Sequence, residues 1–290
     1  MANSKPSFVP PIDPSLLAHV HTPDDWLLKT APRSIDHFNR VLDSIPRNYS
    51  WQFMSVEAFR RIGSTLDAPA AAYRHYWRDM LGQIEAYSIM SAWRLAEISR
   101  SAVWALGRRD VVCAAILSRA ALETAASYAW LQTEIRPALA QVAQGNTPTM
   151  IKYEDGGVAK DLEHKLLKVV FASRLEDAEA FYSPTNILTI IQKVATKVAH
   201  QSAVAEIYSL LCEVAHPNML GRSLYITQVQ PLSGPGHERR LLSTTHGATA
   251  KKILQHSVSA LSWSTGTFSQ SCVVLQETVR SMMEHLQRVR

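Results

Sequence analysis

Two long helical segments joined by a very short connection constrain this fold more than any other part of the sequence. Residues 69–106 carry bulky apolar side chains on more than one side of a helical projection, which is typical of a helix that is packed on several sides. Gly107 suits the end of that helix, and Asp110 suits the start of a second helix over 111–133. So short a connection predicts an antiparallel αα-hairpin at the centre of an all-α, multi-helix bundle.

The N-terminal part should contribute little to this bundle. Residues 1–33 are rich in Pro and polar residues, so we expect an extended N-terminal segment there. Ser34 suits the start of a short helix that runs to Ile45. Residues 34–290 are then expected to form a single helical domain.

After the αα-hairpin, three more helices are expected, over 158–174, 184–198 and 202–216. Gly and polar residues within 144–157 predict a loop before the first of them. The third helix should end before Pro217, because a residue that precedes proline is pushed out of the α region.

The C-terminal third combines a β-hairpin signal with a long helical stripe. Between residues 223 and 245 the periodicity changes around a Gly-Pro-Gly turn, which predicts one small β-hairpin. Apolar residues then recur at spacings of four and three, so the chain should end in one long helix or in two broken near Gly266. Residues 253–276 contain no Asp, Glu, Lys or Arg. We therefore expect the stripe to pack inside the protein's own bundle, with the seam of a homodimer as the alternative.

The cysteines and the net charge indicate the cellular compartment and the kind of partner. Cys113, Cys212 and Cys272 are far apart and lie among apolar residues, which indicates buried, reduced thiols and a cytoplasmic location. We expect no signal peptide and no membrane span. The formal net charge is +5, and residues 217–290 hold 8 Lys and Arg against 3 Asp and Glu. Such a basic excess fits an anionic partner such as RNA, and it also fits a surface tuned for solubility.

The second helix of the αα-hairpin contains an unusual pair of charges. Within 111–133 only Arg119 and Glu123 are charged, and both lie on the face of Val112 and Ala126, which should point toward packed protein. Removing charges from water is costly unless they are paired. The two residues are therefore either a buried pair that sets the helix register or part of a site that opens toward a cleft.

A second polar group surrounds the expected end of the helix over 202–216. It comprises Tyr208, Glu213, His216 and Asn218. A histidine at a helix C-terminus suits phosphate binding or proton donation, and it can equally cap the helix while Asn218 shapes the turn. Glu213 and His216 have the spacing of di-metal ligands, but no second Glu-x-x-His copy is present, so we expect no metal and no cofactor.

These two groups together resemble a known class. An Arg-x-x-x-Glu in an apolar helix, followed by Tyr-x-x-Leu-Cys-Glu-x-x-His-Pro-Asn at a helix end, is similar to uncharacterised bacterial helical proteins related to the HEPN-like bundles, over about 111–221. Many HEPN proteins are metal-independent ribonucleases. The resemblance implies that His216 is the acid or base and that Arg119 stabilises the phosphate, with Tyr208 beside them. Neither residue belongs to the family's own Arg-x4-6-His motif.

Three functions follow from these patterns. The first is a HEPN-like protein that binds or cleaves RNA. The second is a non-enzymatic helical interaction or scaffold protein whose polar residues are buried structure. The third is a small-molecule or metal enzyme with a site in a bundle cavity. The sequence lacks a phosphate loop, a G-x-S-x-G elbow and an H-E-x-x-H motif, which disfavours P-loop nucleotide hydrolysis and serine hydrolysis.

Overall fold

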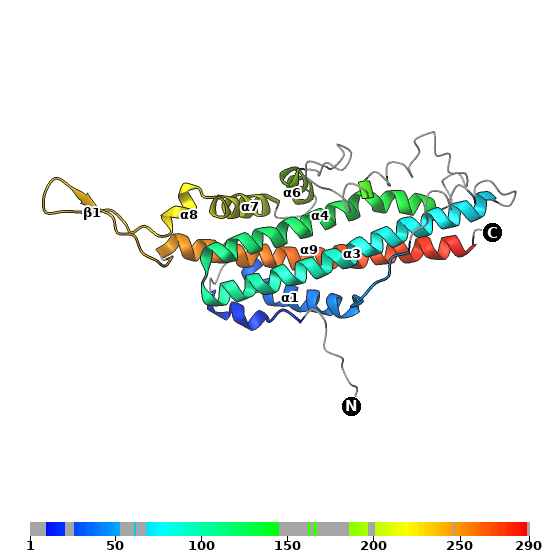
Figure 1. Ribbon diagram of the computed structural model, residues 1–290, viewed down its shortest axis with the longest axis horizontal. Coiled ribbons are helices and arrows are strands. Elements are labelled where there is room, and N and C mark those ends of the chain that lie inside the picture. The colour runs from blue at the N-terminus through cyan, green and yellow to red at the C-terminus, as the bar shows by residue number, and fades with distance from the viewer. Residues whose placement is uncertain are drawn as a thin grey trace, which may run out of the picture.

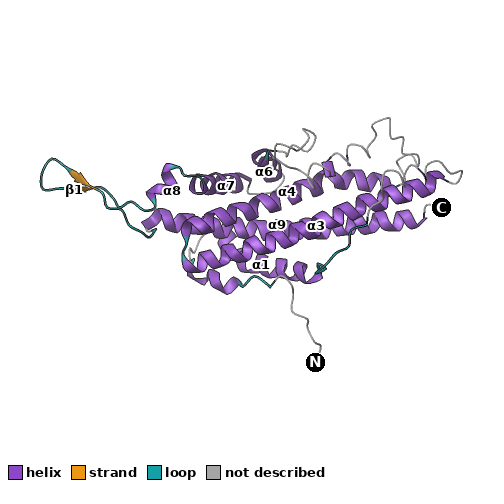
Figure 2. Cartoon of the chain, viewed as in Figure 1, coloured by secondary structure: helices purple, strands orange, loops and turns teal. Residues whose placement is uncertain are grey.

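The computed structural model of the chain is an elongated bundle of helices with one small hairpin (Figures 1 and 2). It describes residues 10–20, 26–52, 61, 68–144, 162, 165–166, 186–196, 201–245 and 247–288. In chain order the elements are η1 (Pro14–His19), α1 (Trp26–Ser44), α3 (Ala68–Arg108), α4 (Val111–Ala143), α6 (Ile187–Ala195), α7 (Gln201–Ala215), α8 (Met219–Ser223), β1 (Gln230–Pro231), β2 (His237–Glu238) and α9 (Gly247–Arg288). The predicted all-α bundle is confirmed.

The long helices α3, α4 and α9 run along the length of the molecule (Figure 1). Helix α4 is central, because it packs on α3, α9, α6 and α7, while α1 covers another side of α9. Helices α1, α4 and α9 meet at Phe268 of α9. Its ring stacks on Tyr128 of α4 with the ring centroids 4.3 Å apart, and it contacts Phe38 of α1 edge-on with the centroids 5.6 Å apart. Each such buried side chain contributes roughly 1.5–3 kcal/mol.

The αα-hairpin is confirmed, but its turn is built differently from the prediction. Arg109, not Gly107, adopts the left-handed conformation, with φ of 60°. The Arg109 amide donates to the Leu106 carbonyl at 3.0 Å and the Asp110 amide to the Ala105 carbonyl at 2.9 Å, which is the Schellman pattern. Gly107 lies inside α3, where a β-carbon would lie 3.6 Å from Leu16. Gly107 therefore lies against η1 and does not end the helix, and a β-carbon there would make only an ordinary van der Waals contact.

The prediction of an extended segment up to residue 33 is wrong for residues 14–19 and 26–33. Asp13 caps η1 by accepting from the Ser15 amide at 2.9 Å. Helix α1 begins eight residues before the predicted start and contains Pro32. The proline is tolerated because it lies on the exposed side of α1, while Ala31 and Ile35 are fully buried and α1 packs against α9. Tertiary burial outweighs the local helix-breaking signal.

Helix α9 is one unbroken helix, and its apolar stripe is buried within the bundle. The stripe residues Leu261, Phe268 and Cys272 are all 0% exposed, so the stripe packs inside the protein's own bundle, as expected. Gly266 does not break the helix: a β-carbon there would lie 3.5 Å from the Ser34 side chain of α1. That distance is an ordinary van der Waals contact, so Gly266 lies where α1 and α9 pack together, but the packing does not require a glycine there.

Six serines of α9 are buried as well: Ser257, Ser259, Ser262, Ser264, Ser269 and Ser271. The hydroxyls of Ser257, Ser264, Thr265 and Ser269 each donate to the carbonyl four residues earlier in the same helix. Buried polar groups are tolerated when they are hydrogen-bonded. Only the Ser262 hydroxyl, among those with a described bond, reaches another helix, at α1.

The predicted β-hairpin is confirmed and extends away from the helices (Figure 1). Strands β1 and β2 pair antiparallel, and a further bridge joins Ile226 to Leu241. The Leu232 amide donates to the Gly236 carbonyl at 3.0 Å and closes the turn. Leu241 is 78% exposed, so the hairpin has almost no core of its own and depends on its base for support.

Helices α6 and α7 pack against α4, and α6 is shorter than the predicted helix over 184–198, because residues 186 and 196 lie outside it. Helix α6 begins after Asn186, whose side chain accepts from the Leu188 amide at 2.9 Å. Helix α7 ends at Ala215, before Pro217, as expected. The helix predicted over 158–174 and the loop predicted within 144–157 fall almost entirely outside the described residues.

The cysteines are free, but they are not all buried. Cys272 is buried, Cys212 is half-buried and Cys113 is exposed, so the prediction of buried thiols is wrong for Cys113. Because Cys113 follows the turn into α4 by only two residues, it lies on the outer side of the helix start. The cytoplasmic location stays a prediction.

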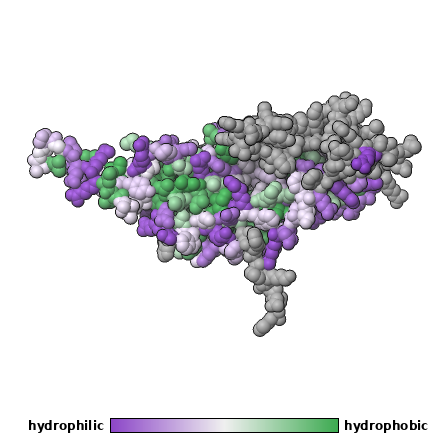
Figure 3. Space-filling view, viewed as in Figure 1, coloured by the Kyte–Doolittle hydropathy of each residue, from purple (hydrophilic) through white to green (hydrophobic). Residues whose placement is uncertain are grey.

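Helix α4 is the one described helix that is long and apolar enough to cross a membrane by length and composition. Half of its apolar window is buried inside the bundle, as in the core helix of many soluble proteins. Apolar surface covers the face formed by the end of α3 and the start of α4 (Figure 3), where Trp104 and Ile116 are exposed. The absence of a membrane span stays a prediction.

Candidate functional site

The charged pair of α4 lies at the edge of the contact between α4 and α7. Arg119 Nε and Glu123 Oε1 are 2.9 Å apart, and the two side chains are 23% and 29% exposed. Burial acts to lower the pKa of Arg119, but the neighbouring Glu123 carboxylate, together with Cys212 and Tyr208, more than offsets it, and the pKa is raised. Arg119 is therefore a permanent cation that is held in place and still reaches solvent.

Tyr208 of α7 completes this pair from the opposite helix. Its hydroxyl donates to Glu123 Oε1 at 3.0 Å, and the Arg119 guanidinium lies 5.7 Å from the centre of its ring. Burial, together with the neighbouring Cys212 and Glu123 side chains, raises the pKa of Tyr208 well above its ordinary value. Tyr208 thus stays protonated and acts as a donor that positions Glu123 and, through it, Arg119.

His216 brings an exposed imidazole to the same place. It follows α7 directly, and its amide donates to the Cys212 carbonyl at 3.0 Å, the last bond of that helix. Arg119 Nη1 lies 3.5 Å from His216 Nε2. A guanidinium can only donate, so Nε2 is the acceptor in this contact. At 3.5 Å the contact is at the outer limit of a hydrogen bond, and an anion can displace it at low cost.

Glu213 and Asn218 shape the turn that carries His216. The Asn218 side-chain amide donates to Glu213 Oε2 at 3.0 Å, and the Asn218 backbone amide donates to the His216 carbonyl at 2.7 Å. Gly221 of α8 packs on this turn, since a β-carbon there would lie 3.1 Å from the Val214 carbonyl. The return of α8 onto the end of α7 fixes the backbone at His216.

The structure thus joins two groups that are about 90 residues apart in sequence. Arg119, Glu123, Tyr208 and His216 form one connected cluster, which we call the Arg–His cluster. Glu213 and Asn218 support it from the adjoining turn. Among the described residues, no group of three or more His, Cys, Asp or Glu is placed to hold a metal ion. The cluster is suited to contacting an anion with a cation and an imidazole.

One neighbour of this cluster was missed from the sequence. Cys212 lies beside Tyr208 and contributes to its raised pKa. The two residues are four apart on α7. That spacing puts them on one face of the helix, and it is the sequence signal that could have identified Cys212 as a neighbour of Tyr208. Cys212 belongs to the support of Tyr208 and does not contact the imidazole through any described bond.

Fold and cluster together define an all-α bundle with an Arg–His cluster where α4 meets the end of α7. Comparisons with protein-family models, with curated proteins and with solved structures return no match. The resemblance to the HEPN-like bundles therefore remains a hypothesis that depends on the motifs themselves.

Proposed function

We propose that this protein binds RNA at the Arg–His cluster and cleaves it without a metal ion. The observation that carries the proposal is the 3.5 Å contact between Arg119 and His216 at the protein surface. A guanidinium binds phosphate oxygens through its planar fork of donors, and an imidazole transfers protons near neutral pH. The resemblance to HEPN-like bundles and the basic excess of residues 217–290 support RNA as the anion.

The roles follow from the geometry of the cluster. His216 takes the proton of a ribose 2′-hydroxyl as that oxygen attacks phosphorus, the bond from phosphorus to the 5′-oxygen breaks, and the leaving oxygen takes a proton from water. Arg119 stabilises the charge that develops on the phosphate oxygens. Tyr208 and Glu123 are positioning residues: Tyr208 donates to the Glu123 carboxylate, and that carboxylate accepts from Arg119 and holds it in place. No cofactor is needed for these steps.

The test is cleavage of a mixed single-stranded and structured RNA pool in EDTA by purified protein. We expect products with 2′,3′-cyclic phosphate ends, and a rate loss of roughly 100-fold or more in His216→Ala, as is typical when a general acid or base is removed. His75→Ala is the matched control, since His75 is an exposed histidine near the start of α3. Equal cleavage by His216→Ala and His75→Ala would refute the assigned role.

Binding is measured separately, by fluorescence anisotropy of a labelled single-stranded RNA. Arg119→Ala should weaken binding, and His216→Ala should bind nearly as well as the parent protein, because the imidazole acts in the chemical step. If the parent protein binds RNA and never cuts it, the binding part of the proposal stands and the catalytic part is wrong.

A second candidate is a non-enzymatic helical interaction or scaffold protein, and one specific observation favours it. Glu123 Oε1 accepts from both Arg119 and Tyr208, so these three side chains link α4 to α7 as a structural unit would. The buried stripe of α9 is not available to a second copy, and a homodimer, if one forms, must use another face. No RNA binding by the parent protein, together with a stability loss in Arg119→Ala, would favour this candidate.

A further inference from the structure

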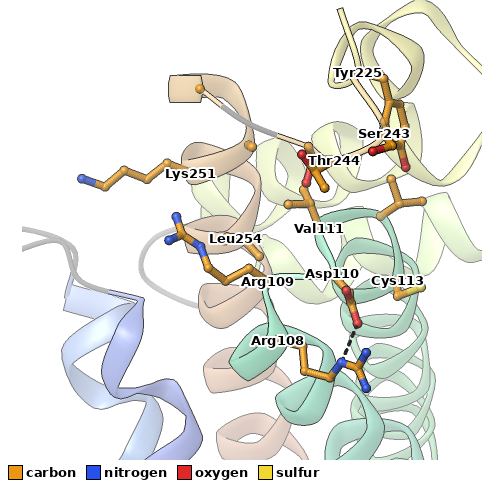
Figure 4. Close-up of a pocket in the computed structure, with 14 residues that line it drawn as sticks. Arg108, Arg109, Asp110, Val111, Cys113, Tyr225, Ser243, Thr244, Lys251 and Leu254 are labelled. Atoms are coloured by element: carbon orange, nitrogen blue, oxygen red, sulfur yellow. Dashed lines mark ion pairs between the residues drawn. The ribbon is translucent and has the colours of Figure 1, made fainter. Parts of the chain in front are cut away.

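A cavity lies at the base of the β-hairpin, outside the Arg–His cluster (Figure 4). Its volume is about 620 Å³, which is within the range of small-molecule pockets. The walls come from the α3–α4 turn, the first turns of α4 and α9, and the two ends of the hairpin where it joins the helices. Segments far apart in the sequence thus build one concave surface.

The cavity is rich in positive charge. Arg108, Arg109 and Lys251 line it, and Asp110 is the only acid among its described lining residues. Asp110 pairs with Arg108 at 3.3 Å, whereas Arg109 and Lys251 are exposed and form no ion pair with a described residue. Figure 4 shows Arg109 and Lys251 extending on one side of α9, with the Arg108–Asp110 pair on the other. Two cations remain for an anionic ligand.

The opposite wall adds an aromatic ring and hydroxyl groups. Tyr225 is 38% exposed, and its carbonyl accepts from the Leu242 amide at 2.9 Å, so the base of the hairpin fixes its position. Figure 4 shows Tyr225 beside Ser243, with Thr244 over the start of α4. In Figure 4 Tyr225 and the ends of Arg109 and Lys251 lie on opposite sides of the first turns of α9. An aromatic ring at one wall and cations at the other suit a segment of a nucleic-acid strand, because a base stacks on the ring and the phosphates beside it are neutralised.

We propose that this cavity holds a short segment of an RNA strand, with one base on Tyr225 and the two phosphates that adjoin it at Arg109 and Lys251. The inference depends on the proposed function, since the strand is the one that reaches the Arg–His cluster. Val112 lines the cavity and lies on the same face of α4 as Arg119, seven residues away, about 10 Å along the helix. A strand that follows α4 therefore links the cavity to the cluster.

The first experiment uses uridine 5′-monophosphate as a probe of the cavity alone, with binding measured by titration calorimetry on the full chain. The double variant Arg109→Ala/Lys251→Ala should lose this binding, and His216→Ala should retain it. The matched control is Arg136→Ala/Arg280→Ala, which removes two exposed cations from α4 and α9 and should bind like the parent protein. No binding by the parent protein, or equal binding by the two double variants, would overturn the proposal.

The second experiment measures the affinity for single-stranded RNA as a function of salt. Removing two phosphate contacts should lower the affinity roughly tenfold and reduce the slope of log K against log salt by about 1.4. Tyr225→Phe should bind like the parent protein, while Tyr225→Ala should bind roughly tenfold more weakly, because only the ring is needed for stacking. Unchanged affinity in Tyr225→Ala would overturn the assignment of the base.

The two proposals fail in different ways. If His216→Ala abolishes cleavage while Arg109→Ala/Lys251→Ala binds RNA as tightly as the control double variant, the proposed function stands and the cavity proposal is wrong. If uridine 5′-monophosphate binds in a manner that depends on Arg109 and Lys251 while no variant affects RNA, the nucleotide site stands and the RNA function is wrong.

Discussion

The hydrogen bond from Tyr208 to Glu123 makes the most direct test of how α7 is held against α4. Tyr208→Phe removes one hydroxyl and leaves the ring under Arg119. The lost bond is 3.0 Å long and ends on a carboxylate, and bonds to charged groups contribute about 1.5–3 kcal/mol. Tyr208 is 5% exposed, but Glu123 is 29% exposed and keeps its bond to Arg119. Water can therefore replace part of the loss, and we expect a destabilisation of about 1.5 kcal/mol.

Chemical denaturation with urea at pH 7 measures this change, and a fall in melting temperature of about 4 °C should accompany it. Tyr49→Phe is the matched control, because the Tyr49 hydroxyl also donates to a carboxylate, that of Glu85, at an exposed position; it should cost less than about 0.5 kcal/mol. A double-mutant cycle with Glu123→Ala should show that Tyr208→Phe is nearly neutral once the carboxylate is gone. Equal losses in the two tyrosine variants, or additivity in the cycle, would refute the reasoning.

The pH dependence of the same variant has a defined sign. The pKa of Tyr208 is raised in the folded protein, because burial and the neighbouring Cys212 and Glu123 side chains disfavour the phenolate. Its contribution to stability is therefore complete below the ordinary tyrosine value and is lost as the pH rises beyond it. The stability difference between the parent protein and Tyr208→Phe should be constant from pH 6 to 9 and should shrink above about pH 10.

Three further substitutions test other parts of the fold, each by urea denaturation. Gly221→Ala should cost about 1–2 kcal/mol, because its β-carbon would lie 3.1 Å from the Val214 carbonyl, a backbone atom; a neutral result would mean that α8 can move freely. Arg109→Gly should stabilise by about 0.5–1 kcal/mol by relieving a φ of 60°, and a loss of stability would contradict the description of the turn. Phe268→Ala should cost about 3–5 kcal/mol, given that its ring is 0% exposed; a loss under about 1 kcal/mol would mean that the core collapses around the site.

Local signals predicted the helices well where they agree with the packing. The proline at position 217 marks the end of α7, and the Gly-Pro-Gly turn marks the β-hairpin. Two signals were misleading. The prolines and polar residues of 1–33 suggested an extended segment, and Gly107 suggested a helix end, whereas Pro32 and Gly107 both lie within helices. Their positions depend on which face of each helix is buried, and that depends on α9 and η1, which are distant in sequence.

The members of the Arg–His cluster were found from the sequence, but their connections were not. Spacing placed Arg119 and Glu123 on one face of α4, and the structure confirms this. The bond between Tyr208 and Glu123 joins residues 85 positions apart, and only the packing of α7 on α4 determines it. The cavity at the base of the hairpin was missed for the same reason, since its cations come from the α3–α4 turn and from α9.

The serines of α9 have a consequence for how such a chain changes over evolution. Four of the hydroxyls bond to carbonyls of their own helix. They therefore need no hydrogen-bond partner on α1 or α4, and these neighbouring helices pack against small side chains. Exchange of Ser257, Ser264 or Ser269 for Ala therefore preserves the bundle, whereas Ser262 bonds to α1. Relatives that share this fold can differ widely along α9, and their common ancestry is better traced through the residues that bind across helices, such as Tyr208, Glu123 and Arg119.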